Sequence, residues 1–469
     1  MLILDKYQAN IAVITDKGER LKYSELKQET DKFSASVPQN GLMFCLCENR
    51  LGSLVGYVSC LEHHIPIVLL DGIQDNSLLK NLINLYHPEY IWGSTEKIGE
   101  IGGRTIYSYA SFSLQQMSYD TDIDVPEINP ELALCLPTSG STGSPKFVRL
   151  SEKNILGNAE SIAEYLQIDE NERPITTLPL YYSYGVSVIN SHLIKGATIL
   201  LTEGTVAQRD FWQFMKEQEA TSMSGVPYTY EMLKRLRFFK MELPHLKVMT
   251  QAGGKLNKDI AKEYIEFAAE KGKKFYVMYG QTEATARMSY LPWESAIDKY
   301  SSIGIAIPGG KFSLIDTDGK EITEPDVDGE LIYEGSNVSL GYAECRADLS
   351  KGDENQGVLC SGDLARRDAD GFYYITGRLK RFVKIWGNRC NLDATEQLVK
   401  SITTNCACAG VDDKITVFVT EFGLEEKIIK HLFEKTGLNT KAFEVKVINN
   451  IPKNYSGKIQ YAELQKLLN

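Results

Sequence analysis

The 469-residue sequence has no hydrophobic run that approaches the roughly 18 residues of a membrane-spanning helix. Its first residues, M-L-I-L-D-K-Y, do not place a basic segment before a long apolar one, so no secretory signal is predicted. A net charge of −11 argues against general nucleic-acid binding. We therefore expect a cytoplasmic protein that neither inserts into a membrane nor binds nucleic acid.

Paired cysteine motifs of the kind that hold zinc are also absent. The nine cysteines are scattered, and the C-x-C pairs that begin at Cys45 and Cys406 have no matching partners. This pattern favours buried free thiols in a reducing compartment over a zinc site. The hydrophobic content of 43% and the charged content of 24% are those of a globular protein.

Charge is divided unevenly along the chain. Residues 379–469 carry 14 Lys and Arg against 10 Asp and Glu, whereas the remainder carries 37 against 52. A basic C-terminal part beside an acidic one could help to close over an anionic ligand, or the division could arise by chance.

Short apolar runs alternate with helical patterns, at a spacing typical of parallel sheets covered by helices. Strands are predicted at 42–47, 65–70, 90–92, 132–136, 147–150, 175–178, 198–201, 248–250 and 275–278. Helices are predicted at 24–33, 77–85, 211–218, 228–236 and 260–269. Past Gly304 the pattern changes to strands punctuated by Gly and Asp, with Asp370-Gly371 as a hairpin turn. A domain boundary is predicted near 377–380.

The central motif is the stretch T-S-G-S-T-G-S-P-K at 138–146. An apolar run leads into it, Phe147–Leu150 is expected to form a return strand, and Ser151 is a plausible cap for a following helix. Backbone N–H groups, hydroxyls and one lysine suit a polyphosphate. The motif differs from G-x-x-x-x-G-K-[ST], because Pro145 removes an N–H group and no Ser or Thr follows Lys146. Composition alone favours a flexible Ser/Gly loop.

Five further segments accompany this loop. They are Q-A-G-G-K-L (251–256), Y-G-Q-T-E-A (279–284), S-G-D-L (361–364), T-G-R-L-K-R (376–381) with K-I-W-G-N-R (384–389), and N-Y-S-G-K-I (454–459). Each is weak alone, but together and in this order they are specific. From about residue 130 onward, the chain resembles the adenylate-forming enzymes, which include acyl-CoA synthetases, adenylation domains of peptide synthetases and firefly luciferase.

The resemblance implies an α/β fold. A large N-terminal domain of helix-covered sheets plus a distorted β-barrel-like part is expected at 1–377, and a small mobile α+β C-terminal domain at 381–469. Residues 378–380 would form the hinge, with Lys380 as its pivot. Rotation of the small domain would exchange an adenylation face for a thiol-transfer face.

The resemblance also implies an AMP-forming acid–thiol ligase. Such an enzyme uses ATP and Mg²⁺ to turn a carboxylic acid into an acyl-adenylate, releases pyrophosphate, and transfers the acyl group to a thiol. The thiol would belong to CoA or to the pantetheine of an acyl carrier protein, and the C-terminal part is somewhat shorter than usual, which leaves both open. The sequence is compatible with a monomer or a homodimer.

The resemblance assigns residues to the phosphates and the metal. The pyrophosphate-gripping loop would comprise Thr138, Ser139, Gly140, Ser141, Thr142 and Gly143, closed by Lys146. Thr282 would contact the α-phosphate, and Glu283 would hold Mg²⁺. Lys458 would bridge the carboxylate and the phosphate as charge develops between them.

A second set would surround the nucleoside: Tyr279, Gly253, Gly254, Gly280, Asp363 and Arg378. Tyr279 would stack on adenine, while Asp363 would accept the ribose hydroxyls and Arg378 would donate to ribose or phosphate oxygens. Gly387 would line the thiol tunnel, where a side chain would obstruct it. Considered singly, Asp363 would be a turn former and Tyr279 a core residue.

The substrate pocket departs from the family pattern. In L-P-L-Y-Y-S-Y-G (178–185), Tyr182 stands where relatives often have histidine and where domains for α-amino acids place aspartate, which argues against an α-amino acid. We expect Tyr182, Ser183 and Val186 to line the pocket, although the tyrosines here could equally be core residues.

Arg287 lies where related enzymes line the acyl pocket. An arginine there would be costly to desolvate without an anionic or strongly polar partner. One interpretation is a substrate with a second polar group, a carboxylate or a hydroxyl, that Arg287 binds. The other is an arginine that turns out of the pocket and pairs with a nearby carboxylate.

Three rival functions stay open. The protein could be a stand-alone adenylation enzyme that loads a carrier protein or passes the acyl group to an amine. It could be an inactive nucleotide-binding relative, although Glu283 and Lys458 speak against this. A luciferase-like oxygenase shares the motifs, but nothing in the sequence argues for its substrate pocket.

Overall fold

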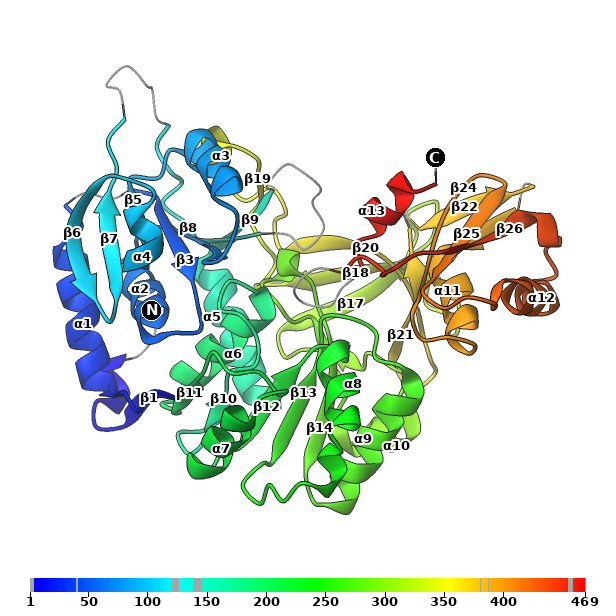
Figure 1. The fold of residues 1–469 in the computed structure, drawn as a ribbon, viewed down its shortest axis with the longest axis horizontal. Coiled ribbons are helices and arrows are strands. Elements are labelled where there is room, and N and C mark those ends of the chain that lie inside the picture. Colours follow the sequence, from blue (N-terminus) through cyan, green and yellow to red (C-terminus); the bar gives the residue numbers. More distant parts are fainter. Residues whose placement is uncertain are drawn as a thin grey trace. The chain divides into compact units, whose positions relative to one another are not determined.

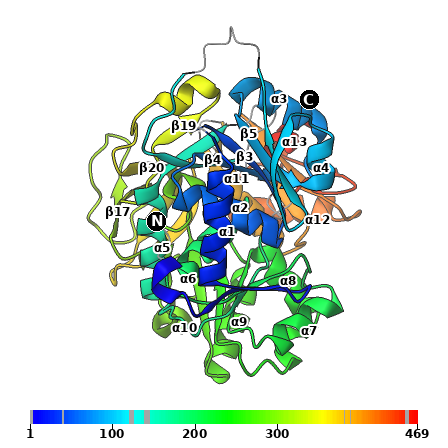
Figure 2. The same ribbon diagram turned by 90° about the vertical axis from the view of Figure 1, so that its left-hand side faces the viewer.

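The computed structural model describes residues 4–38, 41–119, 126–137, 146–379, 381–386, 388–453 and 459–468. The chain divides into two compact units (Figures 1 and 2). The larger comprises Met1–Lys311 with Glu334–Leu359, and the smaller comprises Phe312–Tyr333 with Cys360–Asn469. The boundary expected near 377–380 falls inside the smaller unit, and the hinge there stays a prediction.

The larger unit contains a nine-stranded sheet with the spatial order β16-β15-β14-β13-β12-β10-β11-β1-β2. Its strands are β1 (Ile11–Thr15), β2 (Arg20–Lys22), β10 (Pro174–Ile175), β11 (Ile199–Leu201), β12 (Ser222–Gly225), β13 (Val248–Gln251), β14 (Lys274–Tyr279), β15 (Ser289–Tyr290) and β16 (Ile305–Ala306). Neighbouring strands from β14 to β1 run parallel, and antiparallel strands close both edges. Parallel strands bury both faces, and the chain connects them through α7 (Arg209–Glu217), α8 (Pro227–Arg235) and α9 (Lys258–Glu270).

An eight-stranded sheet lies in the same unit, with the order β19-β9-β8-β4-β3-β5-β7-β6. Its strands are β3 (Met43–Cys47), β4 (Ile67–Asp71), β5 (Tyr90–Ser94), β6 (Arg104–Tyr109), β7 (Phe112–Gln116), β8 (Leu132–Pro137), β9 (Phe147–Ser151) and β19 (Gly341–Ala343). The strands β8, β4, β3 and β5 are parallel, and the others are antiparallel to their neighbours. Helices α1 (Tyr23–Ala35), α2 (Leu51–Glu62), α3 (Asn76–Tyr86) and α4 (Thr95–Gly99) alternate with its first strands.

Two helices lie between these sheets. Helix α5 (Glu152–Tyr165) contacts β8 and β9, α6 (Ser183–Leu193) contacts β11, and the two helices pack against each other (Figure 1). Ser151 caps α5, accepting a hydrogen bond from the Asn154 N–H, while the Asn154 side chain accepts one from the Ser151 N–H. The predicted cap is confirmed. Every residue of α6 is buried, so the helix belongs to the core.

The smaller unit contains a four-stranded sheet and a C-terminal α+β part. The sheet has the order β17-β18-β20-β21, formed by β17 (Gly310–Ile315), β18 (Gly329–Gly335), β20 (Val358–Arg367) and β21 (Tyr373–Arg378). The C-terminal part has a hairpin of β22 (Phe382–Ile385) and β23 (Asn388–Asn391), a sheet of β24 (Cys406–Val411), β25 (Lys414–Val419) and β26 (Phe443–Val447), and helices α11 (Leu392–Lys400), α12 (Glu425–Thr436) and α13 (Tyr461–Lys466). The predicted Asp370-Gly371 turn joins β20 to β21, with Gly371 at φ +87°.

The strands and helices predicted from periodicity are confirmed, with small differences at their ends. Helices α2 and α6 were not predicted, because a helix that is buried on all sides has no polar face and hence no period. All nine cysteines are free and six are buried, as expected for structural thiols. No helix among the described residues is long and apolar enough to cross a membrane.

The buried His192 on α6 makes a prediction about stability against pH. Burial lowers the pKa of His192 from 6.5 to about 4, and the Nδ1–H donates to the Val188 carbonyl at 2.8 Å. Above pH 6.5 the His192 ring is neutral in both the folded and the unfolded state. Between pH 6.5 and 4 the ring is protonated in the unfolded chain but stays neutral in the folded protein. The folded state should therefore lose about 3 kcal/mol between pH 6.5 and 4 through this group.

Urea unfolding at several pH values measures this loss. Other carboxylates also titrate in this range, so the comparison is with His192→Gln, which lacks the titrating ring. The wild-type protein should lose about 3 kcal/mol more than the variant between pH 7 and 4. Parallel stability curves would show that His192 does not contribute.

Candidate functional site

The predicted phosphate-binding loop is flanked by a hairpin in the larger unit. Strands β8 and β9 pair antiparallel, with Pro137 opposite Phe147, so the residues on either side of the motif lie next to each other. Residues 138–145 lie outside the described residues, and with them Thr138, Ser139, Gly140, Ser141, Thr142 and Gly143. Lys380, Gly387 and Lys458 also lie outside them. Their assigned roles stay predictions.

Lys146 is the first described residue after this loop. Its Nζ lies 3.5 Å from the centre of the Tyr342 ring and 3.8 Å from Glu344 Oε1. Both partners come from β19 and the residue after it, and β19 pairs with β9 so that Tyr342 is opposite Val148. The ammonium group is thus held by a π face and a carboxylate at the hairpin end.

Glu283 and Thr282 lie on a short 3-10 helix, Thr282–Ala284, which follows β14. The Tyr342 hydroxyl donates to Glu283 Oε1 at 2.8 Å, and the Ser339 N–H donates to the Glu283 carbonyl at 2.9 Å. The Thr282 hydroxyl lies 3.2 Å from the Ser183 hydroxyl at the start of α6. The structure therefore brings four predicted site residues, Lys146, Thr282, Glu283 and Ser183, into one group with Tyr342.

Close backbone packing explains the glycines beside this group. A Cβ at Gly280 would lie 1.8 Å from the Ala286 carbonyl oxygen, and one at Gly253, where φ is +82°, would lie 2.5 Å from the Tyr182 hydroxyl. Gly254 would place a Cβ 3.2 Å from Pro227. Tyr182 therefore lies against the Gly253 turn, which joins the start of α6 to the predicted adenine-binding segment.

Tyr279 ends β14, and its hydroxyl accepts a hydrogen bond from Gln281 Nε2 at 3.1 Å. The side chain is partly exposed, as stacking on a base requires.

In the smaller unit, Asp363 and Arg378 face each other across β20 and β21. Arg378 Nε donates to Asp363 Oδ1 at 3.1 Å, the carboxylate is buried, and the guanidinium is largely exposed. The Ser361 hydroxyl accepts from the Asp363 N–H at 3.1 Å. A carboxylate fixed beside a guanidinium suits recognition of vicinal hydroxyls, with the arginine available to neighbouring oxygens.

The Glu283 carboxylate suits a hard divalent cation. No group of three His, Cys, Asp or Glu side chains that could enclose a metal occurs within the described ranges. Mg²⁺ does not require one, because it is usually held by one or two carboxylates together with substrate phosphates. Glu283, with oxygen donors from Thr282 and Ser183 nearby, fits that mode.

The comparisons with known proteins agree with this geometry. A family model for AMP-binding enzymes matches residues 4–343. The chain belongs to the AMP-binding enzyme family.

The relatives of this AMP-binding enzyme are distant. An oxalate–CoA ligase of Arabidopsis thaliana is 28% identical over 347 residues, which cover 70% of this chain and 66% of the relative. A long-chain-fatty-acid–CoA ligase of Escherichia coli O157:H7 is 28% identical over 362 residues, which cover 72% and 62%. The matches thus span just under two thirds of these curated relatives.

A solved structure of o-succinylbenzoate CoA synthetase from Bacillus subtilis, in complex with an acyl-adenylate intermediate, has a TM-score of 0.79 to this AMP-binding enzyme. The two are 20% identical, and the superposition covers 99% of this chain and 97% of the other. This likeness confirms the expected α/β fold.

Arg287 is buried in the larger unit of this AMP-binding enzyme, with 2% of its surface exposed. Its Nη1 donates to the Tyr165 hydroxyl at 3.0 Å and contacts Met278 Sδ at 2.9 Å, and its guanidinium lies 4.6 Å from the centre of the Tyr184 ring. Its Nε is buried without a hydrogen-bond partner. No carboxylate among the described residues pairs with it, so within these residues nothing supports the interpretation of an outward-turned, ion-paired arginine.

The other residues expected at the acyl pocket are buried at the start of α6. Tyr184 is a core residue whose hydroxyl donates to the Thr250 carbonyl at 2.9 Å, and Tyr182 and Ser183 are exposed by only 6% and 7%. Val186 is fully buried. A pocket-lining role for Tyr182, Ser183 and Val186 stays a prediction.

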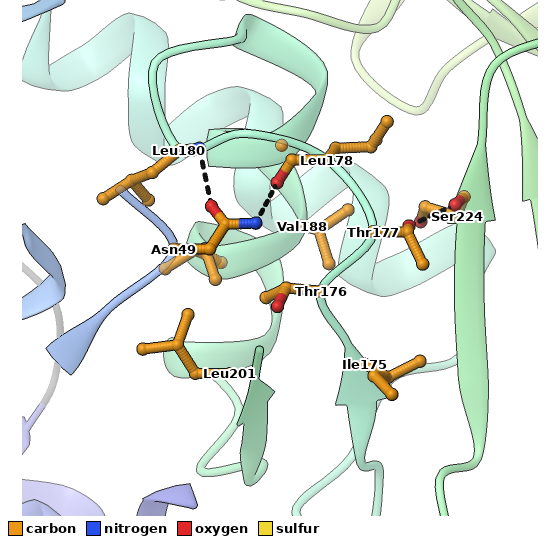
Figure 3. Close-up of a pocket in the computed structure, with 11 residues that line it drawn as sticks. Asn49, Ile175, Thr176, Thr177, Leu178, Leu180, Val188, Leu201 and Ser224 are labelled. Carbon is orange, nitrogen blue, oxygen red and sulfur yellow. Dashed lines mark hydrogen bonds between the residues drawn. The ribbon is translucent and has the colours of Figure 1, made fainter. Parts of the chain in front are cut away.

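A cavity of about 10 Å³ lies beneath α6, as Figure 3 shows. Its walls include Asn49, Ile175, Leu201 and Val188. Asn49 spans it, accepting from the Leu180 N–H at 3.1 Å and donating to the Leu178 carbonyl at 3.1 Å. This volume holds about one water molecule, so the cavity is too small for an acyl group.

Two contributors to the site were missed by sequence reasoning. Tyr342 lies in a plain G-Y-A-E run, and Ser339 acts only through its backbone. Their sole signal is the glycine at 341, which adopts φ +122°.

Gly280 offers a test of the packing that shapes this site. Gly280→Ala would push a methyl group into the Ala286 carbonyl and should destabilise the larger unit by about 1–3 kcal/mol. The matched control is Gly99→Ala, where nothing lies within 4 Å and alanine suits the helix better. Thermal unfolding should show a lower melting temperature for Gly280→Ala and no lower one for Gly99→Ala. Equal melting temperatures would contradict the close contact between Gly280 and the Ala286 carbonyl.

Proposed function

We propose that this protein activates a carboxylic acid with ATP as an acyl-adenylate, releases pyrophosphate, and then transfers the acyl group to a thiol to give a thioester. The observation that carries the proposal is the group at the β8–β9 hairpin end. There Lys146, Thr282 and Glu283 belong to one group of contacts, and Lys146 directly follows in sequence the segment that resembles the family's phosphate-binding motif.

The chain's own residues divide the work. Lys146 and the backbone donors of residues 138–145 neutralise the departing pyrophosphate, and Thr282 donates to the α-phosphate. Glu283 holds Mg²⁺, which, when bound, stabilises charge on the phosphate oxygens. Tyr279 stacks on the base, and Asp363 and Arg378 hold the ribose. Lys458 balances the charge that develops as the carboxylate attacks.

The second half-reaction requires a different surface at the same carbonyl carbon. Departing pyrophosphate and an incoming pantetheine cannot occupy one pocket together, so residues 381–469 rotate about Lys380. Gly387 then lines the path of the thiol. The acceptor is CoA or a carrier-protein pantetheine. Pyrophosphate release over a panel of acids, followed by thioester formation with and without CoA, tests the proposal; no release with any acid would overturn it.

Lys458→Ala should separate the two half-reactions. Adenylation should fall by roughly two to four orders of magnitude, because a cation aimed at developing charge is lost. Given preformed acyl-adenylate and a thiol, the variant should still make thioester. Quenched-flow assays of each step measure both rates, and equal damage to both would contradict the assigned role.

Arg287 supports a narrower substrate class. Within the part of the chain that the structure describes, this buried guanidinium has no carboxylate partner, so a counter-charge is missing from its surroundings. We propose that the substrate supplies it through a second anionic or strongly polar group, bound by forked hydrogen bonds. The curated relatives range from oxalate to long-chain fatty acids, so they do not decide the matter.

Arg287→Leu should cost the preferred acid roughly 2–5 kcal/mol of affinity while plain aliphatic acids are used no worse. Because an under-bonded buried charge is removed, the ligand-free variant should also melt no lower than the wild-type protein. Substrate panels and thermal unfolding measure both effects, with Arg287→Lys as the charge-retaining control. A substrate profile identical to that of the wild-type protein would contradict the idea.

A further inference from the structure

Tyr342 touches both charged residues of the proposed phosphate site, on two different parts of its side chain. Its hydroxyl donates to Glu283 Oε1 at 2.8 Å, while its ring lies 3.5 Å from Lys146 Nζ. One aromatic residue is therefore in contact with the proposed metal ligand and with the proposed phosphate-binding cation. These two groups have opposite charges and would attract each other.

The position of Tyr342 is fixed by its backbone. It lies in β19, opposite Val148 of β9, and its carbonyl accepts a hydrogen bond from Arg149 Nε at 3.0 Å. Three residues earlier, the Ser339 N–H holds the Glu283 backbone carbonyl at 2.9 Å. One segment thus binds Glu283 at both its backbone and its carboxylate.

The nature of the donor matters for a metal ligand. The Tyr342 hydroxyl is a neutral donor, because a tyrosine hydroxyl keeps its proton near neutral pH. A neutral donor orients one carboxylate oxygen and leaves the negative charge in place. A lysine bonded to the same carboxylate would cancel the charge that attracts a cation. Hydrogen bonds of this kind to ligating carboxylates commonly set metal affinity.

We propose that Tyr342 is a positioning residue. Its hydroxyl orients the Glu283 carboxylate toward Mg²⁺. Its ring binds the Lys146 ammonium group through a cation–π contact and so keeps it away from that carboxylate. This role rests on the proposed function, because it requires that Glu283 binds the metal that accompanies ATP. It adds a residue outside the six sequence motifs.

The test measures binding rather than turnover. The probe is α,β-methylene-ATP, which cannot be cleaved between the α- and β-phosphates, titrated calorimetrically with and without Mg²⁺. Tyr342→Phe keeps the ring under Lys146 and removes only the hydroxyl. The gain in affinity that Mg²⁺ confers should fall about tenfold, while metal-free affinity should not change.

Tyr342→Leu removes the ring as well. For this variant, the affinity for the analogue without Mg²⁺ should also fall, because the Lys146 ammonium group loses its contact with the ring. The matched control is Tyr107→Phe in the same unit, which removes a tyrosine hydroxyl from Glu29 at 3.3 Å. It should leave both affinities unchanged. If Tyr342→Leu does not fold, Tyr342→Phe alone decides the question.

The outcomes separate the two proposals. A wild-type protein that does not bind the analogue would overturn both the proposed function and the role of Tyr342. A wild-type protein that shows the Mg²⁺ effect, together with a Tyr342→Phe variant that shows it undiminished, would overturn only the positioning role. An equal loss in Tyr107→Phe would do the same, because the effect would then be general.

Discussion

The fully buried guanidinium of Arg149 holds together the segments on which the site depends. Nε and Nη2 donate to the carbonyls of Tyr342 and Leu340 at 3.0 Å, and Nη2 also reaches Glu354 Oε2 at 2.6 Å. Nη1 donates to the Lys351 carbonyl. A buried arginine is tolerated only when such acceptors satisfy it, and here they come from two passes of the chain beside β9. This one side chain helps to hold β19 in place, and β19 in turn positions Tyr342 and Glu283.

Arg287 is the opposite case in the same unit. Arg287 is similarly buried. Among the described residues its Nε has no hydrogen-bond partner, and its guanidinium contacts a hydroxyl, a thioether sulfur and an aromatic face instead of a carboxylate. The neighbouring His192 cannot supply the counter-charge, because an imidazole is either neutral or cationic. Burying a charged group in this way does not stabilise the fold. Sites where a protein departs from the usual rules of burial and pairing tend to be functional.

The sequence predicted the fold where periodicity was strong. Amphipathic helices such as α1 and α9 and most of the parallel strands were found from spacing alone, whereas the parallel strands β1 and β12 were not predicted. Helices α2 and α6 were not predicted, because a helix that is buried on every side has no alternation of apolar and polar residues. The motif residues Lys146, Thr282 and Glu283 were brought together as expected. Tyr342 could not be predicted from the sequence. Its role depends on the pairing between β9 and β19, which joins residues almost 200 positions apart.

The complete burial of α6 limits which substitutions the chain can accept along this helix. A helix with no solvent-facing residue has no position at which a side chain can be exchanged without disturbing its neighbours. Any change there alters packing, so substitutions along this helix are coupled to folding. The segment that enters the helix is no exception, because Tyr181 and Tyr182 are exposed by only 8% and 6%. The helix and its entry segment should therefore change slowly in sequence.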